Sequence, residues 1–348
     1  MLRYYVLCCR NMWALKRHET TIPKSQLTIV INTLDSDFEL QAIAYCQMHD
    51  IDYVVTESDG TPATGKNSVI DTFLASDNQF FVLVDGDDFL TPHGVWTYQH
   101  IANMESPPDV LGLEYQYGIW PEKGYGQLGI QDWTDPSIVE VLQNPILGCT
   151  DKNNASAIQG YGTRVFLKNK AWWEDAIAGR LVRQTAGDEF GAELTEVHRR
   201  WAQYCYKYIS NWESHIRVVF FSRAAAEAHR YNPEYVVGED TLMYLMFKDS
   251  SVRGDLVLKN LYDRYPTYVY DTRVAGIVQE NKDVDGVGDR GWLLWMKKLS
   301  DGYEQFESEG RMHTDTVPYI NTEIVWPEGY TPDTLGVVNY PGKQHIIY

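Results

Sequence analysis

The chain has 348 residues, of which 44% are hydrophobic, and this is enough to bury a core in one large domain or two moderate ones. Its 48 acidic residues against 30 Lys and Arg give a formal net charge of −18, which argues against broad nonspecific attraction to nucleic acid or anionic membranes. Five cysteines without a C-x-x-C spacing indicate neither a disulfide framework nor a thiolate zinc site, and they favour a reducing cytoplasm. No segment predicts a membrane span, since the apolar run before Arg10 is too short.

The first half of the chain alternates between strand and helix patterns. Residues 27–33 (LTIVINT) predict a strand, and Ser36 with Glu39 forms a capping box that opens a helix to about residue 48. Residues 52–56 (DYVVT) predict a second strand, and a Gly-rich turn then leads into a helix over 67–75. This alternation predicts an α/β fold with a mostly parallel central sheet, flanking helices and right-handed crossovers.

Residues 79–92 (QFFVLVDGDDFLTP) predict a buried strand that runs directly into a group of aspartates. Open α/β sheets bind ligands at this carboxyl edge. Asp85, Asp87 and Asp88 repel one another unless a cation neutralises them, and Mg²⁺ or Mn²⁺ prefers oxygen ligands of this kind. The sequence therefore predicts a metal held against an anionic substrate such as a diphosphate. An acidic turn that binds nothing is the alternative interpretation.

Beyond residue 105 the pattern is less regular, and the predicted elements are shorter. Strands are predicted at 110–117, 157–166, 216–221 and 267–270, and helices at 171–178, 193–209, 240–247 and 291–299. The last 40 residues are rich in Pro, Gly and Thr, which indicates an appended, ordered tail.

The segment GTPATGKN, from Gly60 to Asn67, matches the phosphate-binding loop G-x-x-x-x-G-K-[ST] at every position but the last. It follows one predicted strand and opens a predicted helix. Two observations count against this interpretation: Asn67 replaces the hydroxyl that would bind Mg²⁺, and a complete strand–helix unit precedes the loop. A P-loop phosphotransferase that uses Gly60 to Lys66 remains an alternative.

Residues 52–96 resemble the nucleotide-sugar-binding half of a glycosyltransferase of the GT-A fold, and are most similar to the large inverting family 2. In that family a strand leads to a Gly, a loop ending in Arg-Asn, a helix, an apolar strand, an aspartate cluster and a Pro. Gly60, Lys66, Asn67 and Pro92 stand at these positions here. The resemblance implies a Rossmann-like GT-A fold with an irregular acceptor-side half and a C-terminal extension.

The same resemblance implies roles for the residues of the motif. Mn²⁺ or Mg²⁺ would be held by Asp85 and Asp87, and Lys66 would place a cation beside the diphosphate of a nucleotide sugar, a UDP-sugar above all. Gly60 and Asn67 would complete the donor site.

The family also has an additional strand and a uracil-contacting Asp before that Gly, where this chain is abbreviated. By location only, the candidates for contacts with the base are Asn32, Thr33, Asp35 and Glu57.

A second matching element is VVGEDT at residues 236–241, which enters an apolar helix pattern. In family 2 an acidic pair at this position supplies the general base, because inversion by direct displacement needs a carboxylate that takes the proton of the acceptor hydroxyl. The resemblance points to Asp240 first and Glu239 second. The alternative is a structural role, in which Asp240 is the N-cap of the helix. This role is compatible with the role of general base.

The part of the chain expected to bind the acceptor contains one segment with an excess of basic residues. Residues 197–230 hold six Arg or Lys against two Glu, and their first part, HRRWAQYCYKY, interleaves cations with aromatic residues. Arg199, Arg200 and Lys207 are therefore candidates for contacts with DNA, as in glycosyltransferases that modify hydroxymethylated bases in bacteriophage DNA and act in the host cytoplasm. A helix that packs its aromatic residues inward is the more common cause of this pattern. A polysaccharide, protein or small acceptor stays open.

These observations together predict a metal-dependent, inverting hexosyl- or pentosyltransferase. We expect a nucleotide-sugar-binding half at 1–110, an acceptor-binding and catalytic-base half at 111–270, and a C-terminal extension at 271–348. A noncatalytic sugar- or nucleic-acid-binding protein is the competing hypothesis from another class.

Overall fold

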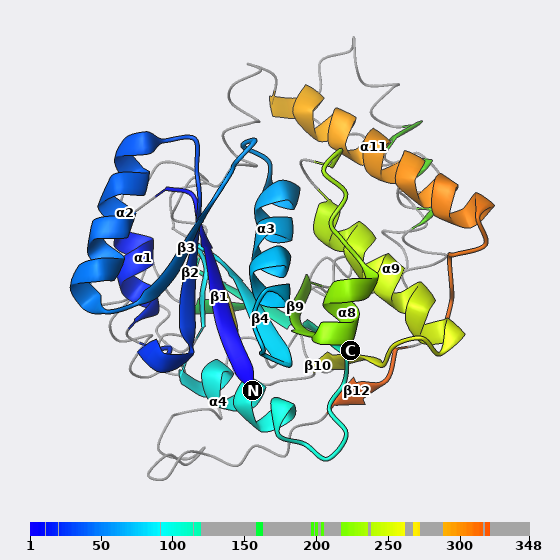
Figure 1. Ribbon diagram of the computed structural model, residues 1–348. Helices are drawn as coiled ribbons and strands as arrows, with labels where there is room; N and C mark the ends of the chain where they lie inside the picture. Colours follow the sequence, from blue (N-terminus) through cyan, green and yellow to red (C-terminus); the bar gives the residue numbers. More distant parts are fainter. Residues whose placement is uncertain are drawn as a thin grey trace.

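The computed structural model describes most of the N-terminal half of the chain and several segments of the C-terminal half (Figure 1). The described residues are 1–10, 12–19, 21–90, 92–113, 115–119, 158–162, 196–197, 199–200, 203–204, 217–235, 238–261, 267–271, 288–315 and 317–320. No helix among them is both long enough and apolar enough to cross a membrane.

An eight-stranded sheet forms the centre of the molecule. In spatial order its strands are β12 (Tyr319–Ile320), β10 (Leu258–Leu261), β6 (Val110–Leu113), β9 (Arg217–Ser222), β4 (Phe80–Asp85), β1 (Leu2–Cys8), β2 (Leu27–Asn32) and β3 (Asp52–Thr56). All neighbouring strands are parallel except that β9 runs antiparallel to both β4 and β6. The prediction of an α/β fold with a mostly parallel central sheet and flanking helices is confirmed.

An interior strand of this sheet, β1, is one that the sequence patterns did not predict. Tyr4, Val6 and Cys8 are fully buried on one of its faces, and it pairs with both β2 and β4. Apart from Arg3 its side chains are hydrophobic, as expected for a strand covered on both sides, and so it lacks the alternation that identifies a half-buried strand. The first strand–helix unit therefore begins at Leu2, one strand earlier than the sequence patterns predicted.

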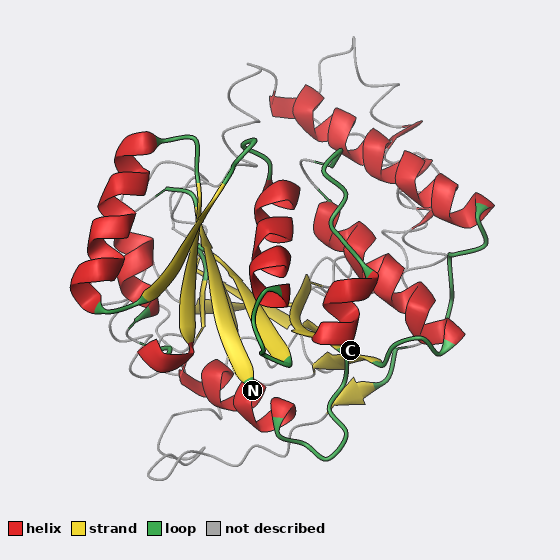
Figure 2. Ribbon diagram, in the orientation of Figure 1, coloured by secondary structure: helices red, strands yellow, loops and turns green. Residues whose placement is uncertain are grey.

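Helices cover both faces of the central sheet (Figure 2). One layer consists of α1 (Met12–His18), α2 (Ser36–His49) and α4 (Pro92–Ala102), and the other of α3 (Pro62–Leu74), α8 (Arg223–Ala228) and α9 (Glu239–Arg253). Successive β1 side chains serve the two layers, because neighbouring residues of a strand point to opposite faces: Tyr4 and Val6 pack with the first layer, and Tyr5 packs with the second.

A smaller four-stranded sheet consists of β5 (Phe89–Leu90), β11 (Tyr268–Asp271), β7 (Tyr115–Ile119) and β8 (Ile158–Gly162), in that spatial order. The single strand predicted at 110–117 is thus two strands, β6 in the main sheet and β7 in the small one. The strands predicted at 157–166, 216–221 and 267–270 are confirmed in their described residues as β8, β9 and β11.

Helix boundaries differ from the predicted ones where a different residue caps the helix. Asp35, and not Ser36, is the N-cap of α2, because its carboxylate accepts hydrogen bonds from the backbone N–H groups of Asp37 and Phe38. Thr61 caps α3 and Pro62 is its first residue, so this helix begins five residues before the predicted start at residue 67.

The C-terminal part of the described chain packs on these layers. A long helix, α11 (Gly288–Ser308), includes the predicted helix 291–299 and buries Leu299 and Tyr303. After it, β12 pairs with β10 at the edge of the main sheet. The helix predicted at 171–178 and most of the one predicted at 193–209 lie outside the described residues. The division of the chain into three regions stays a prediction.

Candidate active site

The order of the strands places the reversal of the sheet's winding at the carboxyl ends of β1 and β4. The chain proceeds from β1 outward to β2 and β3, then returns to the other side of β1 with β4, so the direction of winding reverses between β1 and β4. Open α/β sheets bind ligands at such a reversal. The backbone after β4 lies close to the end of β1 here, because a Cβ on Gly86 would collide with the carbonyl oxygen of Leu7.

The predicted aspartate cluster lies at this position. Asp85 ends β4, and the turn after it is closed by a 3.0 Å hydrogen bond from the Asp88 N–H to the Asp85 carbonyl. Asp85, Asp87 and Asp88 each offer a carboxylate oxygen, and these oxygens lie within 4.8 Å of one another. Their environments differ: the Asp88 side chain is fully buried, whereas Asp85 is 22% exposed.

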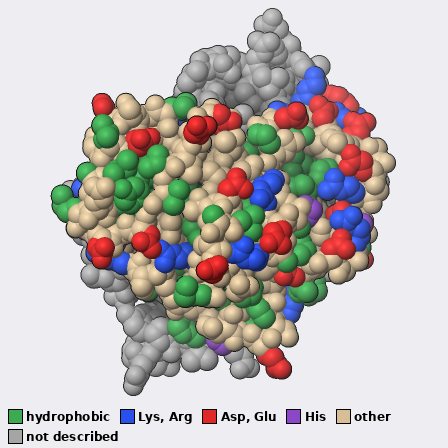
Figure 3. All heavy atoms as spheres, in the orientation of Figure 1, with side chains coloured by type: hydrophobic (Ala, Val, Ile, Leu, Met, Phe, Trp, Pro, Cys, Tyr) green, Lys and Arg blue, Asp and Glu red, His purple; other side chains and the backbone are tan. Residues whose placement is uncertain are grey.

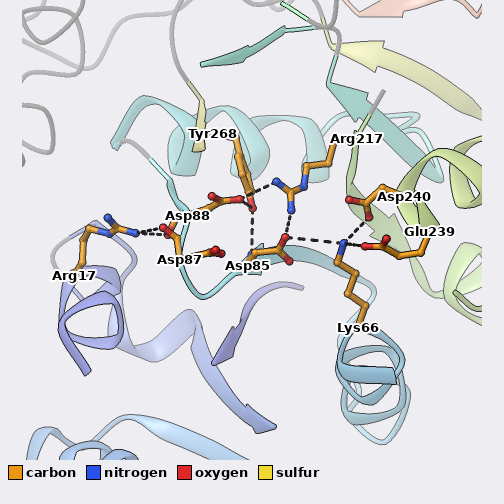
Figure 4. Close-up of polar contacts among 9 residues, drawn as sticks. All are labelled: Arg17, Lys66, Asp85, Asp87, Asp88, Arg217, Glu239, Asp240 and Tyr268. Atoms are coloured by element: carbon orange, nitrogen blue, oxygen red, sulfur yellow. Dashed lines mark hydrogen bonds and ion pairs between the residues drawn. The ribbon is translucent and has the colours of Figure 1, made fainter. Parts of the chain in front are cut away.

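Arg217, on β9, lies directly beside two of these carboxylates (Figure 4). One guanidinium nitrogen donates to Asp88 Oδ2 at 2.7 Å, and another donates to Asp85 Oδ2. The strand register explains the contact: Phe80 pairs with Ser222 and Val82 with Phe220, and continuing this antiparallel pairing brings residue 217 opposite residue 85. The sequence suggested only that Arg217 belongs to a basic segment, because the register of β9 cannot be read from composition.

Tyr268, on β11 of the small sheet, completes this contact. Its hydroxyl donates to Asp88 Oδ2 at 2.7 Å and accepts a 3.1 Å hydrogen bond from the N–H of Asp85. Its ring lies 4.8 Å from the guanidinium carbon of Arg217. Burial, and after it the nearby carboxylate of Asp88, raises the pKa of Tyr268 far above its usual value, although Arg217 acts in the opposite direction. The hydroxyl is therefore a permanent donor to Asp88.

The other side of the aspartate turn is held by the end of α1. Arg17 donates to the backbone carbonyls of Asp87 and Asp88 at 2.7 and 2.8 Å, and its guanidinium lies 4.4 Å from the ring centre of Phe89. The neighbouring His18 ring nitrogen lies 3.3 Å from the Gly86 carbonyl. Burial, with Arg17 beside it, lowers the pKa of His18 to about 3, so that this ring is neutral. The sequence patterns did not identify this support, because α1 was not predicted.

Lys66 connects the aspartate cluster to a second pair of acids. The prediction that Lys66 lies in a loop is wrong: it is in the second turn of α3, and its side chain is 3% exposed. Its ammonium lies 2.6 Å from Asp240 Oδ1, 2.8 Å from Glu239 Oε1 and 3.9 Å from Asp85 Oδ2. Burial alone would lower the pKa of Lys66, but the carboxylates of Asp240 and Glu239 outweigh it and raise the pKa. Lys66 is therefore a fixed cation between the two groups.

The start of α9 carries the acidic pair predicted from VVGEDT. The capping alternative is wrong, because Gly238 is the N-cap, with φ of 86°, and Asp240 lies in the first helical turn with its carboxylate on Lys66. Burial raises the pKa of Glu239 despite Lys66, whereas for Asp240 the cations of Lys66 and Arg217 outweigh burial and lower the pKa. Asp240 is also the more accessible, with 29% of its side chain exposed against 8% for Glu239.

The helical position of Lys66 also removes the geometry of a P-loop. The backbone N–H of Gly65 donates to the Thr61 carbonyl, and the Thr64 N–H is capped by the Thr61 hydroxyl. These N–H groups are those that a phosphate-binding loop would leave open to its ligand. The segment from Gly60 to Lys66 is thus a capped helix start.

Asn67 was predicted to contact the nucleotide-sugar donor, but its side chain bonds to the protein backbone. Its amide nitrogen donates to the Tyr231 carbonyl at 2.8 Å, and its amide oxygen accepts from the Tyr231 N–H at 2.9 Å. This pair of bonds fixes Tyr231, whose ring centre lies 5.3 Å from the Lys66 ammonium. Asn67 therefore acts on the charged cluster through Tyr231.

The candidates for contacts with a base lie at or just after the ends of β2 and β3, and the side chains of three of them already bond to the protein. Asn32 is buried and donates to the Thr56 hydroxyl and the Glu57 carbonyl, and the Thr33 hydroxyl donates to the carbonyl of Cys9. Asp35 caps α2 as described above, and Glu57 is exposed. Gly60 has φ of 81° in the turn before α3. Their roles toward a donor stay predictions.

The basic residues proposed for DNA contacts have acidic partners in the part of the chain that the structure describes. Arg199 pairs with Glu196, and Arg200 pairs with Asp301 at 2.8 Å and with Glu304. Lys207 lies outside the described residues. On the face drawn in Figure 3, basic side chains lie next to acidic ones and do not gather in one continuous basic area.

The donor set of the aspartate cluster fits a hard divalent cation. It consists of carboxylate oxygens, which Mg²⁺ and Mn²⁺ prefer. Asp85 Oδ1 is buried and has no hydrogen-bond partner, and a buried carboxylate oxygen is costly unless a partner satisfies it. Asp85 and Asp87 are therefore the residues that would hold the ion, with Asp88 tied behind them by Arg217 and Tyr268.

Comparison with known proteins gives remote likenesses. No protein-family model matches the sequence, and a search of curated proteins finds no match. Among solved structures, S. aureus TarS 1-349 in complex with UDP-GlcNAc is 12% identical, covers 78% of this chain and has a TM-score of 0.39. S. aureus TarS 1-349 alone is also 12% identical, with 88% of this chain and 72% of that chain covered and a TM-score of 0.41.

The inositol-1-phosphate CTP transferase from T. maritima is 10% identical, with 36% of this chain and 61% of that chain covered and a TM-score of 0.21. The present chain spans 58% of the length of TarS 1-349 as it stands in the UDP-GlcNAc complex.

Proposed function

We propose that this chain is a metal-dependent glycosyltransferase of the GT-A type that transfers a sugar from a nucleoside diphosphate, UDP above all, to a hydroxyl group with inversion. The observation that carries the proposal is the bridge made by Lys66. This buried cation joins Asp85, at the end of β4, to the carboxylates of Glu239 and Asp240 at the start of α9. This contact supports a site in which the proposed diphosphate ligands and the proposed proton acceptor lie beside each other, as a direct displacement requires.

In the proposed reaction the acceptor oxygen forms a bond to the anomeric carbon of the sugar. The bond between that carbon and the diphosphate oxygen breaks, and its electron pair leaves with the nucleoside diphosphate. Asp240 takes the proton of the acceptor hydroxyl. We assign this role to Asp240 because it is the more exposed of the pair and because Lys66 and Arg217 keep it ionised.

The chain's own residues supply the remaining functions of such a site. A metal ion held by Asp85 and Asp87 would stabilise the negative charge that develops on the departing diphosphate. Lys66, which lies near Asp85, adds a positive charge that attracts the donor. Glu239, buried and with a raised pKa, supports Lys66 from the side away from solvent.

The acceptor is proposed only as a hydroxyl compound. Because Arg199 and Arg200 are paired with acids, they give no specific support for a DNA backbone. A P-loop phosphotransferase is not retained as a second function, since the segment that would cradle the phosphates is the first turn of α3.

The proposal is tested by incubating the purified chain with a panel of UDP-sugars and measuring the release of UDP, with Mn²⁺ or with EDTA. We expect release with Mn²⁺ and none with EDTA. Asp240→Asn should lower turnover by about 10²–10⁴-fold while Mn²⁺-dependent UDP binding is kept, because the base acts after the donor is bound.

Glu239→Gln is the matched control, since it also replaces an acid that pairs with Lys66 but leaves the proposed base in place. Turnover that persists in EDTA would contradict metal dependence. Equal turnover in Asp240→Asn and Glu239→Gln would contradict the assignment of the base.

A further inference from the structure

Arg217 occupies the place of a cation within the aspartate cluster. Its guanidinium contacts carboxylate oxygens of both Asp85 and Asp88, and its side chain is 8% exposed. The Tyr268 ring beside it and the Tyr268 hydroxyl on Asp88 fix the orientation of this ion pair. Such a buried, two-carboxylate contact is geometrically specific, in contrast to an exposed surface pair.

The charges around the guanidinium of Arg217 determine how it would affect a metal ion in the cluster. The cluster drawn in Figure 4 contains five carboxylates and three cationic side chains. Its formal charge is therefore −2 when every acid is ionised. A divalent ion on Asp85 and Asp87 would neutralise this charge, but it would also lie beside the fixed guanidinium of Arg217. Two like charges a few ångströms apart repel each other strongly in a partly buried site.

A diphosphate changes this balance. Its negative charge is attracted by the metal, by Arg217 and by Lys66 together, so the repulsion between the metal and the two side-chain cations is offset only when the anion is present. Asp85, one of the two proposed metal ligands, is held in place by Arg217 before either ligand arrives.

We propose that Arg217 is a positioning residue that makes metal binding conditional on an anionic ligand: it holds Asp85 and Asp88 as a resident cation, and it disfavours the metal ion until a diphosphate binds with it. The inference rests on the proposed function and adds to it a reason for coupled binding of metal and donor. Arg217 acts through Asp85 and Asp88 and through its charge.

The test measures Mn²⁺ affinity from the electron paramagnetic resonance signal of free Mn²⁺, with and without UDP, in the wild type and in Arg217→Gln. A neighbouring charge shifts proton affinity of a carboxyl group by about tenfold or more, and we expect an effect of that order on Mn²⁺. In the wild type, UDP should tighten Mn²⁺ binding by about tenfold or more. In Arg217→Gln, Mn²⁺ alone should bind more tightly by a similar factor, and the effect of UDP should shrink accordingly.

Arg200→Gln is the control, because it removes an arginine from an exposed ion pair with Asp301 and leaves the cluster intact; its Mn²⁺ affinities should equal those of the wild type. Arg217→Lys serves if Arg217→Gln does not fold. A lysine keeps one charge but lacks the two-carboxylate fork, so UDP should still tighten Mn²⁺ binding in this variant.

Two results would overturn the inference: Mn²⁺ binding by the wild type that does not depend on UDP, or a folded Arg217→Gln that binds Mn²⁺ alone no more tightly than the wild type. In the second case UDP-dependent Mn²⁺ binding by the wild type would leave the proposed function standing. Conversely, UDP-dependent Mn²⁺ binding by the wild type and tighter binding of Mn²⁺ alone by Arg217→Gln, together with no release of UDP from any UDP-sugar, would support the role of Arg217 and count against the proposed function.

Discussion

Replacing Lys66 by methionine tests the buried charge network most directly. The substitution keeps the length of the side chain but removes the ammonium that lies 2.6 Å from Asp240 and 2.8 Å from Glu239. Because Lys66 and Glu239 are both buried, the variant leaves the Glu239 carboxylate without its counter-charge in the folded state. Removing one partner of a buried ion pair costs about 3–5 kcal/mol. We therefore expect the free energy of unfolding to fall by an amount of that size near neutral pH.

The loss of stability in Lys66→Met should also depend on pH, and the direction of this dependence follows from the pKa shifts. In the wild type, the pKa of Asp240 is lowered by Lys66, so its contribution to stability is present above the unfolded value and is lost as the pH falls through the folded value. In Lys66→Met the ammonium no longer opposes burial, so the pKa of Glu239 rises further above its unfolded value, and for Asp240 only Arg217 is left to lower the pKa. The stability of the variant then falls as the pH rises from about 4, and the difference from the wild type is largest at neutral pH.

The assay is urea unfolding of both proteins at about pH 7.5 and about pH 5, followed by circular dichroism. Arg200→Met is the matched control, since it removes a cation from a pair with Asp301 and Glu304, each more than half exposed, and should cost less than about 1 kcal/mol at either pH. A loss below about 1 kcal/mol in Lys66→Met, or a loss that does not shrink on acidification, would refute the reasoning.

Two further substitutions test the packing around the site. Asn67→Ala removes both hydrogen bonds to the backbone of Tyr231 and should lower the free energy of unfolding by about 1–3 kcal/mol, measured by urea unfolding; an unchanged midpoint would show that these bonds do not stabilise the fold. Gly86→Ala places a methyl group against the carbonyl of Leu7 and 3.1 Å from the Cα of Cys8. It should lower stability by about 1–3 kcal/mol, visible as a lower thermal midpoint, whereas a midpoint equal to the wild type would mean that the close approach of β1 and the turn is not required.

The sequence by itself determined the chemistry of one edge of the fold. An apolar run that ends in Asp85, Asp87 and Asp88 must become a buried strand with acids at its carboxyl end, and the alternation of strands and helices before it fixed a mostly parallel sheet. The strands at 27–33 and 52–56 were predicted with ends that the structure moves by no more than one residue. These features are local, because periodicity and capping depend on residues close together in the chain.

The tertiary structure alone decided which charges meet. Lys66 contacts Glu239 and Asp240, which lie 173 and 174 residues further along the chain, and Arg217 reaches Asp85 from 132 residues away. The first contact depends on the start of α3 at Pro62, and the second on the register of an antiparallel strand, neither of which composition specifies. The strand β1 was not predicted for a related reason: buried on both faces, it has no periodicity that would separate it from any other apolar segment.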